Sequence, residues 1–182
     1  MVLSGISSSF SKNNLKRGIV IFALALALTR VTTIISYFVG FDMTIRFGIL
    51  HMLGISIIIA HFLRKANVFV ILGVSAACII SGLYLASLPT IEIRFLAELN
   101  SRWALGFYSA DYYPLLPNCG YVFAGLAIGK TLYKNGRSLF PKADFAIWRP
   151  FQWISRQCLI LYFAHQVVLF GALYLFGMIF IK

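Results

Sequence analysis

The sequence predicts an all-α integral membrane protein: a polytopic helix bundle with five full transmembrane helices and a partial helix at the N-terminus. Composition is the first reason, because 60% of the 182 residues are apolar, 12% are charged and the mean hydropathy is +0.88. About a quarter of the residues are charged in a soluble domain. The second reason is that five long apolar stretches alternate with segments that are either Lys/Arg-rich or acid-containing. We expect residues 1–182 to form a single membrane domain.

The first two spans follow from apolar runs near the N-terminus. Residues 19–38 form the first span, and residues 47–63 form the second. The second span is short, because 17 helical residues rise only about 25 Å against a hydrocarbon core of about 30 Å. A thinned bilayer or snorkelling flanking residues can accommodate such a span.

The remaining three spans are apolar runs, two of which are bounded by proline. Residues 68–88 form the third span, which ends before Pro89, and residues 158–181 form the fifth. Residues 115–132 form the fourth, and the Pro-rich stretch 113–117 suits its start, because the first N–H groups of a helix lack intrahelical partners.

Residues 1–10 are apolar and rich in small side chains, but ten helical residues reach only about 15 Å and cannot cross a bilayer alone. They do not resemble a signal peptide, because no basic residue precedes them and the basic segment from Lys12 to Arg17 follows. One interpretation is an interfacial or re-entrant helix. We favour the other, which is the second half of a transmembrane helix whose first half is absent.

The charges predict an orientation. Eleven of the 16 Lys and Arg residues lie in segments 11–18, 64–67 and 130–156, and four of the five acids lie in the other connections. An excess of Lys and Arg marks the cytoplasmic side. We therefore expect a multi-pass protein of the cell membrane, with these three segments cytoplasmic and the C-terminus outside. The net charge of +11 is then explained by orientation and by anionic lipid headgroups, so the expected partner is the lipid bilayer and not nucleic acid.

Several polar residues lie within the expected spans, where a charged side chain costs about 2.5–3.5 kcal/mol on insertion scales. Arg30 has two interpretations of equal weight: a structural Arg paired with a carboxylate or carbonyls, or a clamp for an anionic group. His51 and His165, the latter followed by Gln166, could accept or donate a proton near neutral pH. The alternative for each His, and the more frequent one for an isolated membrane His, is an interhelical hydrogen bond.

Polar residues also flank the fourth span. Asp111 could favour the N-terminus of that helix through its dipole, and Tyr112 and Tyr113 could belong to an interfacial aromatic belt or stack on a sugar ring. Lys134 and Arg137 lie in the basic segment that follows the span, which would attract anionic lipid or a phosphorylated cytosolic donor.

Two further patterns have structural interpretations. The glycines of Gly125-x-x-x-Gly129 permit close approach of a neighbouring helix, and packing is their expected use. The three cysteines are scattered, without the spacing of a disulfide framework or a zinc site, so no metal is expected.

Four blocks in order resemble successive blocks of one family. They are Ser4–Ser9 followed by Lys16 and Arg17, Phe47–Gly54, Asp111–Pro117 leading to Gly125 and Gly129, and Leu161–Gln166. The family is the bacterial DUF1624 family, which is similar to the catalytic domain of heparan-alpha-glucosaminide N-acetyltransferase. The chain begins at the block that falls inside the second helix of relatives. Asn118 stands where relatives usually have Trp.

The resemblance implies a membrane acyltransferase of the N- or O-acetyltransferase kind. The donor would be cytosolic acetyl-CoA or another acyl-CoA, and the acceptor a hydroxyl or amine of a saccharide-type molecule on the far side. The acceptor needs a general base, and the thioester oxygen needs a hydrogen-bond donor as it becomes anionic. The candidate residues are His51, His165 and Asp111 for catalysis, Arg30, Gln166, Tyr112 and Tyr113 for the acceptor, and Lys134 and Arg137 for the donor phosphates.

A second hypothesis is a non-enzymatic polytopic membrane protein, either a small permease or a subunit of a membrane assembly. It predicts that the polar residues pair among themselves and leave no cavity open to both sides. A cavity from the basic segment 130–156 to Asp111 would favour the enzyme. Either hypothesis is compatible with a homo-oligomer.

Overall fold

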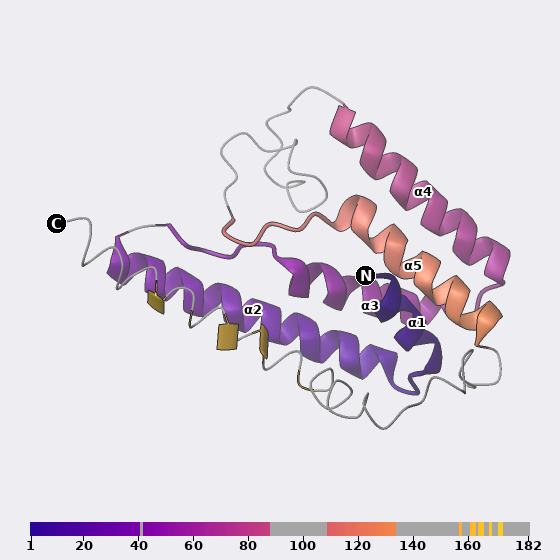
Figure 1. Cartoon of the computed structure of the whole chain (residues 1–182), viewed down its shortest axis with the longest axis horizontal. Helices are drawn as coiled ribbons and strands as arrows, with labels where there is room; N and C mark the ends of the chain where they lie inside the picture. Colours follow the sequence, from indigo (N-terminus) through magenta and orange to yellow (C-terminus); the bar gives the residue numbers. More distant parts are fainter. Residues whose placement is uncertain are drawn as a thin grey trace. The chain divides into compact units, whose positions relative to one another are not determined.

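The computed structural model describes residues 1–40, 42–87 and 109–133, together with a few positions between 157 and 172. The chain divides into two compact units, Met1–Arg137 and Ser138–Lys182. The described part of the first unit contains five helices and no strand (Figure 1). They are α1 (Val2–Phe10), α2 (Asn14–Val39), α3 (Ile49–Leu63), α4 (Val68–Ser87) and α5 (Leu115–Leu132).

The all-helical prediction is confirmed for the described residues. The first span was expected from Ile19, but α2 begins five residues earlier, at Asn14, so the helix includes part of the basic segment 11–18. The second span was expected from Phe47, but α3 begins at Ile49, because Gly48 has an extended backbone with φ −108° and ψ −174°. The fifth expected span, 158–181, lies largely outside the described residues. Within the described part, two helices are long and apolar enough to cross a membrane, Asn14–Phe38 and Val68–Ser87. Five full crossings and a single domain therefore stay predictions.

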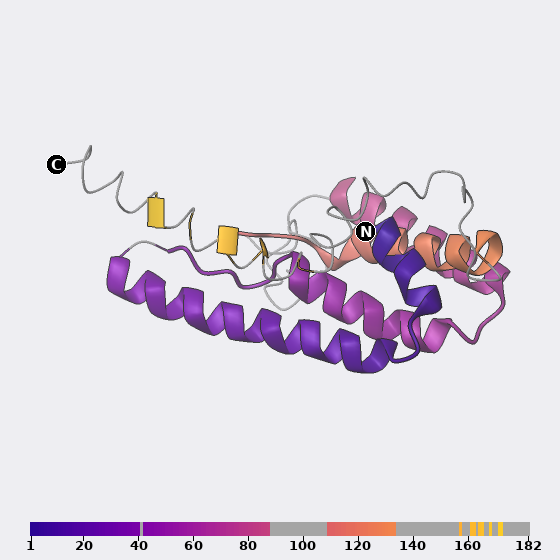
Figure 2. The same ribbon diagram turned by 60° about the horizontal axis from the view of Figure 1, so that its bottom comes forward.

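Two antiparallel helix pairs form the first unit. Helix α2 packs on α3, and α4 packs on α5 (Figures 1 and 2). Helix α5 also contacts α3, and the short α1 lies against α5 and α3. The buried cluster at the centre joins three helices and consists of Ala60 from α3, Ile71 from α4, and Cys119, Phe123, Leu126 and Ala127 from α5.

Proline sets the start of α5. Leu116 has an extended backbone, with φ −99° and ψ 132°, inside the range assigned to the helix. The ring of Pro117 disfavours helical dihedrals in the residue before it, so the regular helix begins at Pro117 itself. The expected entry through the Pro-rich stretch is confirmed.

Glycines allow α1 and α5 to touch backbone to backbone. A Cβ on Gly125 would overlap the carbonyl oxygen of Val2, and a Cβ on Gly5 would overlap that of Val122. Gly129 lies against the side chain of Ser9 in the same way. The packing interpretation of the Gly125-x-x-x-Gly129 spacing is therefore confirmed, and the partner helix is α1.

One end of the first unit gathers basic side chains around the end of α3. The ammonium group of Lys130 donates to the carbonyl oxygens of Arg64, at 2.9 Å, and Ala66, at 2.7 Å. The guanidinium group of Arg64 donates to the carbonyl of Ser11. A positive charge at a helix C-terminus interacts favourably with the helix dipole and satisfies carbonyls that lack intrahelical partners.

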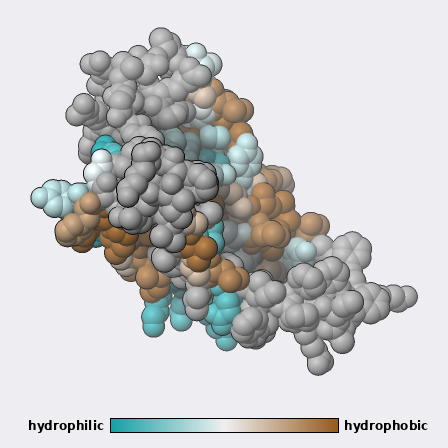
Figure 3. Space-filling view, turned by 60° about the vertical axis from the view of Figure 1, so that its left-hand side comes forward, coloured by the Kyte–Doolittle hydropathy of each residue, from teal (hydrophilic) through white to brown (hydrophobic). Residues whose placement is uncertain are grey.

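The described helices expose much apolar surface, as the brown areas of Figure 3 show. In the most apolar 18-residue stretch of α2, only 17% is buried, and the same holds for α4. The exposed large side chains include Ile19, Val20, Leu26, Val31 and Ile34 on α2 and Phe69, Ile80 and Leu83 on α4. Apolar faces of this extent indicate contact with lipid or with other helices.

The contact between α1 and α5 gives a stability prediction. Gly125→Ala should destabilise the protein by about 1–3 kcal/mol, because the methyl group overlaps backbone that cannot move aside cheaply. Gly73→Ala on α4 is the matched control, since a Cβ there meets nothing within 4 Å and alanine is the better helix former. Thermal unfolding in detergent measures both, and equal melting temperatures for the two variants would contradict the packing.

Candidate functional site

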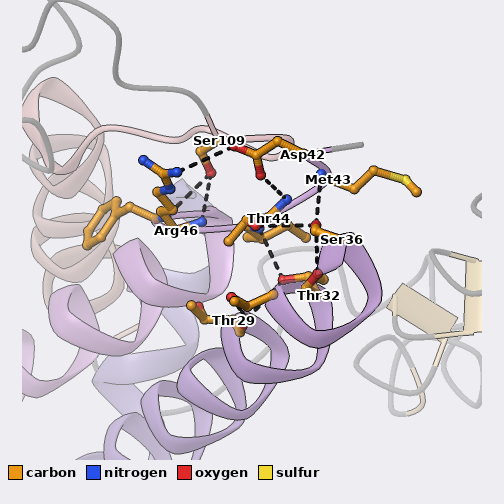
Figure 4. Close-up of polar contacts among 11 residues, drawn as sticks. Thr29, Thr32, Ser36, Asp42, Met43, Thr44, Arg46 and Ser109 are labelled. Atoms are coloured by element: carbon orange, nitrogen blue, oxygen red, sulfur yellow. Dashed lines mark hydrogen bonds and ion pairs between the residues drawn. The ribbon is translucent and has the colours of Figure 1, made fainter. Parts of the chain in front are cut away.

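The connection between α2 and α3, residues 42–48, is called here the 42–48 loop. It has no regular secondary structure, yet every backbone N–H from Met43 to Ile49 donates to a side chain. Two of these acceptors belong to α2: the N–H of Met43 donates to Ser36 Oγ at 2.9 Å, and that of Ile45 donates to Thr32 Oγ1 at 3.1 Å (Figure 4). Hydroxyl groups of α2 therefore hold the loop along the helix surface.

The segment 109–114, distant in sequence, lies against the 42–48 loop and runs in the same direction. Four hydrogen bonds join the two segments, directly or through Ser109. They are Arg46 N to Ser109 Oγ at 3.0 Å, Phe47 N to Ser109 Oγ at 3.4 Å, Ala110 N to Thr44 O at 3.2 Å and Tyr113 N to Phe47 O at 3.2 Å. The segment that leads into α5 is thus hydrogen-bonded to the loop that leads into α3.

His51 connects the loop, α3 and α2. Its Nδ1 accepts the N–H of Gly48 at 3.2 Å, and its Nε2 lies 3.2 Å from Thr29 Oγ1 on α2. The ring stacks on Phe47 with centroids 5.4 Å apart and meets the edge of Phe22 at 6.0 Å. The side chain is only 3% exposed. The expected interhelical hydrogen bond of this His is therefore present.

Asp111 lies at the N-terminus of α3. Its Oδ2 accepts the N–H of Ile49 at 3.4 Å, and a Cβ on Gly48 would come within 2.6 Å of the same oxygen. The sequence suggested an Asp favoured by the dipole of the fourth span, but the observed contact is with the start of α3, whose unpaired N–H groups attract a carboxylate. His51 lies in the first turn of that helix, so the two groups interact electrostatically.

The structure brings two of the three predicted catalytic residues together. His51 and Asp111 share the N-terminus of α3, and the half-buried Tyr113 is tied to the 42–48 loop. His165 belongs to the second unit, where its side chain is exposed and its Nδ1 donates to the carbonyl of Tyr162 at 2.6 Å. Arg30 follows Thr29 on α2 and is exposed.

The other predicted site residues are placed less fully. Tyr112 is half-buried in the segment that precedes α5. Three of them lie outside the described residues: Gln166, Lys134 and Arg137. Their roles in binding stay predictions.

Sequence reasoning missed the hydroxyl side chains that hold this region. Thr29, Thr32 and Ser36 lie three and four residues apart, so they line one face of α2. That spacing was available as a signal. Ser109 gave no comparable signal, because its partners in the 42–48 loop are more than 60 residues away.

Asp42 carries the clearest electrostatic effect in the 42–48 loop. The hydroxyl and the backbone N–H of Thr44 hold the pKa of the Asp42 carboxyl below its ordinary 3.8, and the Arg46 guanidinium adds to this effect. The Asp42–Arg46 ion pair, at 3.4 Å, is itself exposed. The ion pair therefore contributes little to the stability of the fold beyond the hydrogen bonds to Asp42.

Metal ligation has no support in the described ranges. They contain no group of three or more His, Cys, Asp or Glu side chains that could hold a metal ion.

These features define an all-helical protein in which two helices could cross a membrane and a buried His interacts with an Asp at a helix N-terminus. The model of one family, described as "Heparan-alpha-glucosaminide N-acetyltransferase, catalytic", matches residues 1–167, and the chain belongs to this family. The family is membrane-associated, and its acetyltransferases use acetyl-CoA as the donor. No curated protein and no solved structure matches the chain.

The hydroxyl face of α2 gives a second stability prediction. Thr32→Val should cost about 1–3 kcal/mol, because the buried N–H of Ile45 loses its acceptor. Thr33→Val is the matched control: Thr33 is exposed and bonds only a carbonyl of its own helix, so its loss should stay within about 0.5 kcal/mol. Thermal unfolding of both variants checks this, and a Thr33→Val protein as unstable as Thr32→Val would refute it.

Asp42 gives a prediction for pH. A carboxyl whose pKa is lowered on folding stabilises the folded state above its unfolded pKa of 3.8, and this contribution is lost as the pH falls through the folded value. The wild-type protein should therefore be more stable to unfolding than Asp42→Asn near neutral pH, and this difference in stability should disappear on acidification below about pH 4. Melting temperatures measured across this range test the sign; an advantage that grows with acid would be inconsistent with it.

Proposed function

We propose that the protein is a membrane acyltransferase that moves an acyl group from acetyl-CoA, or another acyl-CoA, to a saccharide-type acceptor across the bilayer. The observation that carries the proposal is that His51 and Asp111 both lie at the N-terminus of α3 in a chain of the acetyltransferase family. Acyl transfer needs a group that takes the acceptor proton and a group that donates to the thioester oxygen. A carboxylate and an imidazole can supply both.

The distribution of charge supports an oriented, multi-pass arrangement in the cell membrane. Arg64 and Lys130 lie together at one end of the α3–α5 pair, next to the segment 11–18. Asp42 and Asp111 lie at the opposite end of α3, where α2 ends and α3 begins. We assign the basic end to the cytoplasmic, donor side and the 42–48 loop to the acceptor side.

The remaining roles follow the same division. Lys134 and Arg137 would meet the phosphates of the donor, and Tyr112 and Tyr113, close to Asp111, would meet the acceptor. Arg30 and Gln166 would contact its polar or anionic groups. His165 would be a further catalytic group.

A second function is favoured by one specific observation. Both ring nitrogens of His51, and the ammonium of Lys130, are engaged by groups of the protein itself. A non-enzymatic membrane protein, either a permease or a subunit of an assembly, would use its polar residues in this way.

The experiment is an acyl-transfer assay on the full chain in proteoliposomes, with labelled acetyl-CoA on one side and a glucosamine-type acceptor on the other. His51→Ala and Asp111→Asn should each lower kcat by about 10²–10⁴, the usual contribution of a group that transfers a proton or stabilises the oxyanion. His61→Ala, on the same helix and without an assigned role, is the control and should retain activity.

Thermal unfolding of each variant separates loss of chemistry from loss of fold. Full turnover in well-folded His51→Ala would remove that residue from the mechanism. A folded wild-type protein that transfers nothing to any hydroxyl or amine acceptor would favour the non-enzymatic function.

A further inference from the structure

We propose that His51 works as a hydrogen-bond donor through Nε2–H, and that Thr29 is the residue that positions it. The inference rests on the proposed acyl transfer for its chemical meaning, but the state of the ring follows from the geometry alone. It assigns to His51 the part of stabilising the oxyanion and excludes it as the base that deprotonates the acceptor.

The Gly48 contact determines the state of Nδ1. A backbone N–H can only donate, so Nδ1, at 3.2 Å from Gly48 N, must present a lone pair. The neutral imidazole then carries its proton on Nε2. Burial of the side chain, 3% exposed, leaves water little opportunity to compete for either nitrogen.

The Thr29 contact agrees with that assignment from the other side of the ring. The hydroxyl of Thr29 has one proton, and it lies in position to donate it to the carbonyl of Ala25 at 3.3 Å. The same oxygen is then free only to accept, and the atom it faces at 3.2 Å is Nε2 of His51. All three hydrogen bonds therefore run in one direction. The N–H of Gly48 donates to Nδ1, Nε2–H donates to the Thr29 hydroxyl, and that hydroxyl donates to the carbonyl of Ala25.

This polarity restricts the chemistry. In acyl transfer the acceptor oxygen or nitrogen bonds to the acyl carbon, the carbon–sulfur bond breaks, and the acceptor proton ends on the thiolate of CoA. His51 cannot carry that proton, because Nδ1 is occupied and Nε2 is already protonated. With the ring held in place, Nε2–H can donate to a thioester carbonyl oxygen that takes the position of the Thr29 hydroxyl, since an oxygen that becomes anionic forms the stronger hydrogen bond.

The direct test is nitrogen NMR of the full chain in lipid nanodiscs with ¹⁵N-labelled histidine. His51→Asn identifies the His51 signals by their loss. We expect a protonated Nε2 and a lone pair on Nδ1 at neutral pH. A ring protonated on Nδ1 would overturn the inference, whether or not the protein transfers acyl groups, so this result is separate from the fate of the proposed function.

Substitutions test the part played by Thr29. Thr29→Val should shift the Nε2 signal and lower kcat by about tenfold with little change in KM, because His51 remains but loses its orientation. Thr29→Ser should restore both, since the hydroxyl returns. Thr33→Val, four residues along α2 with an exposed hydroxyl, is the matched control. An unchanged Nε2 signal in Thr29→Val would refute the positioning role.

Discussion

The structure between α2 and α3 depends on one requirement: backbone N–H groups outside a helix need acceptors. Seven consecutive N–H groups, from Met43 to Ile49, each donate to a side chain. Non-helical backbone at membrane depth is tolerated only where protein or enclosed water satisfies it. Helix α2, the segment 109–114, α3 and, for Thr44, Asp42 of the loop itself supply these acceptors.

The arrangement of the candidate site follows from that requirement. The N–H of Gly48 is satisfied by the ring of His51 and that of Ile49 by Asp111, so the groups that satisfy the backbone are the same groups that could perform chemistry. The N-terminus of α3 also attracts the carboxylate through its dipole. At the other end of α3, Lys130 satisfies carbonyls, so both ends of this short helix are held by side chains from α5 or its approach.

Much of the fold could be predicted from the sequence, because apolar runs ended by proline and charge are local signals. The range of α4 differs from its prediction by one residue, and α5 ends where predicted, although its regular helix begins at Pro117 and not at Leu115. The candidate site could be predicted only in part. His51 and Asp111 were recognised as polar residues, but Ser109 meets the 42–48 loop across more than 60 residues, which no local pattern reveals.

Amide hydrogen exchange of the 42–48 loop in lipid nanodiscs tests the central claim most directly. The account predicts that the N–H groups from Met43 to Ile49 exchange as slowly as those in the first turn of α3. Exchange of this stretch at the rate of an unstructured loop would contradict the account, because its N–H groups would then be bonded to water and not to the side chains of α2, Asp42, Ser109, His51 and Asp111.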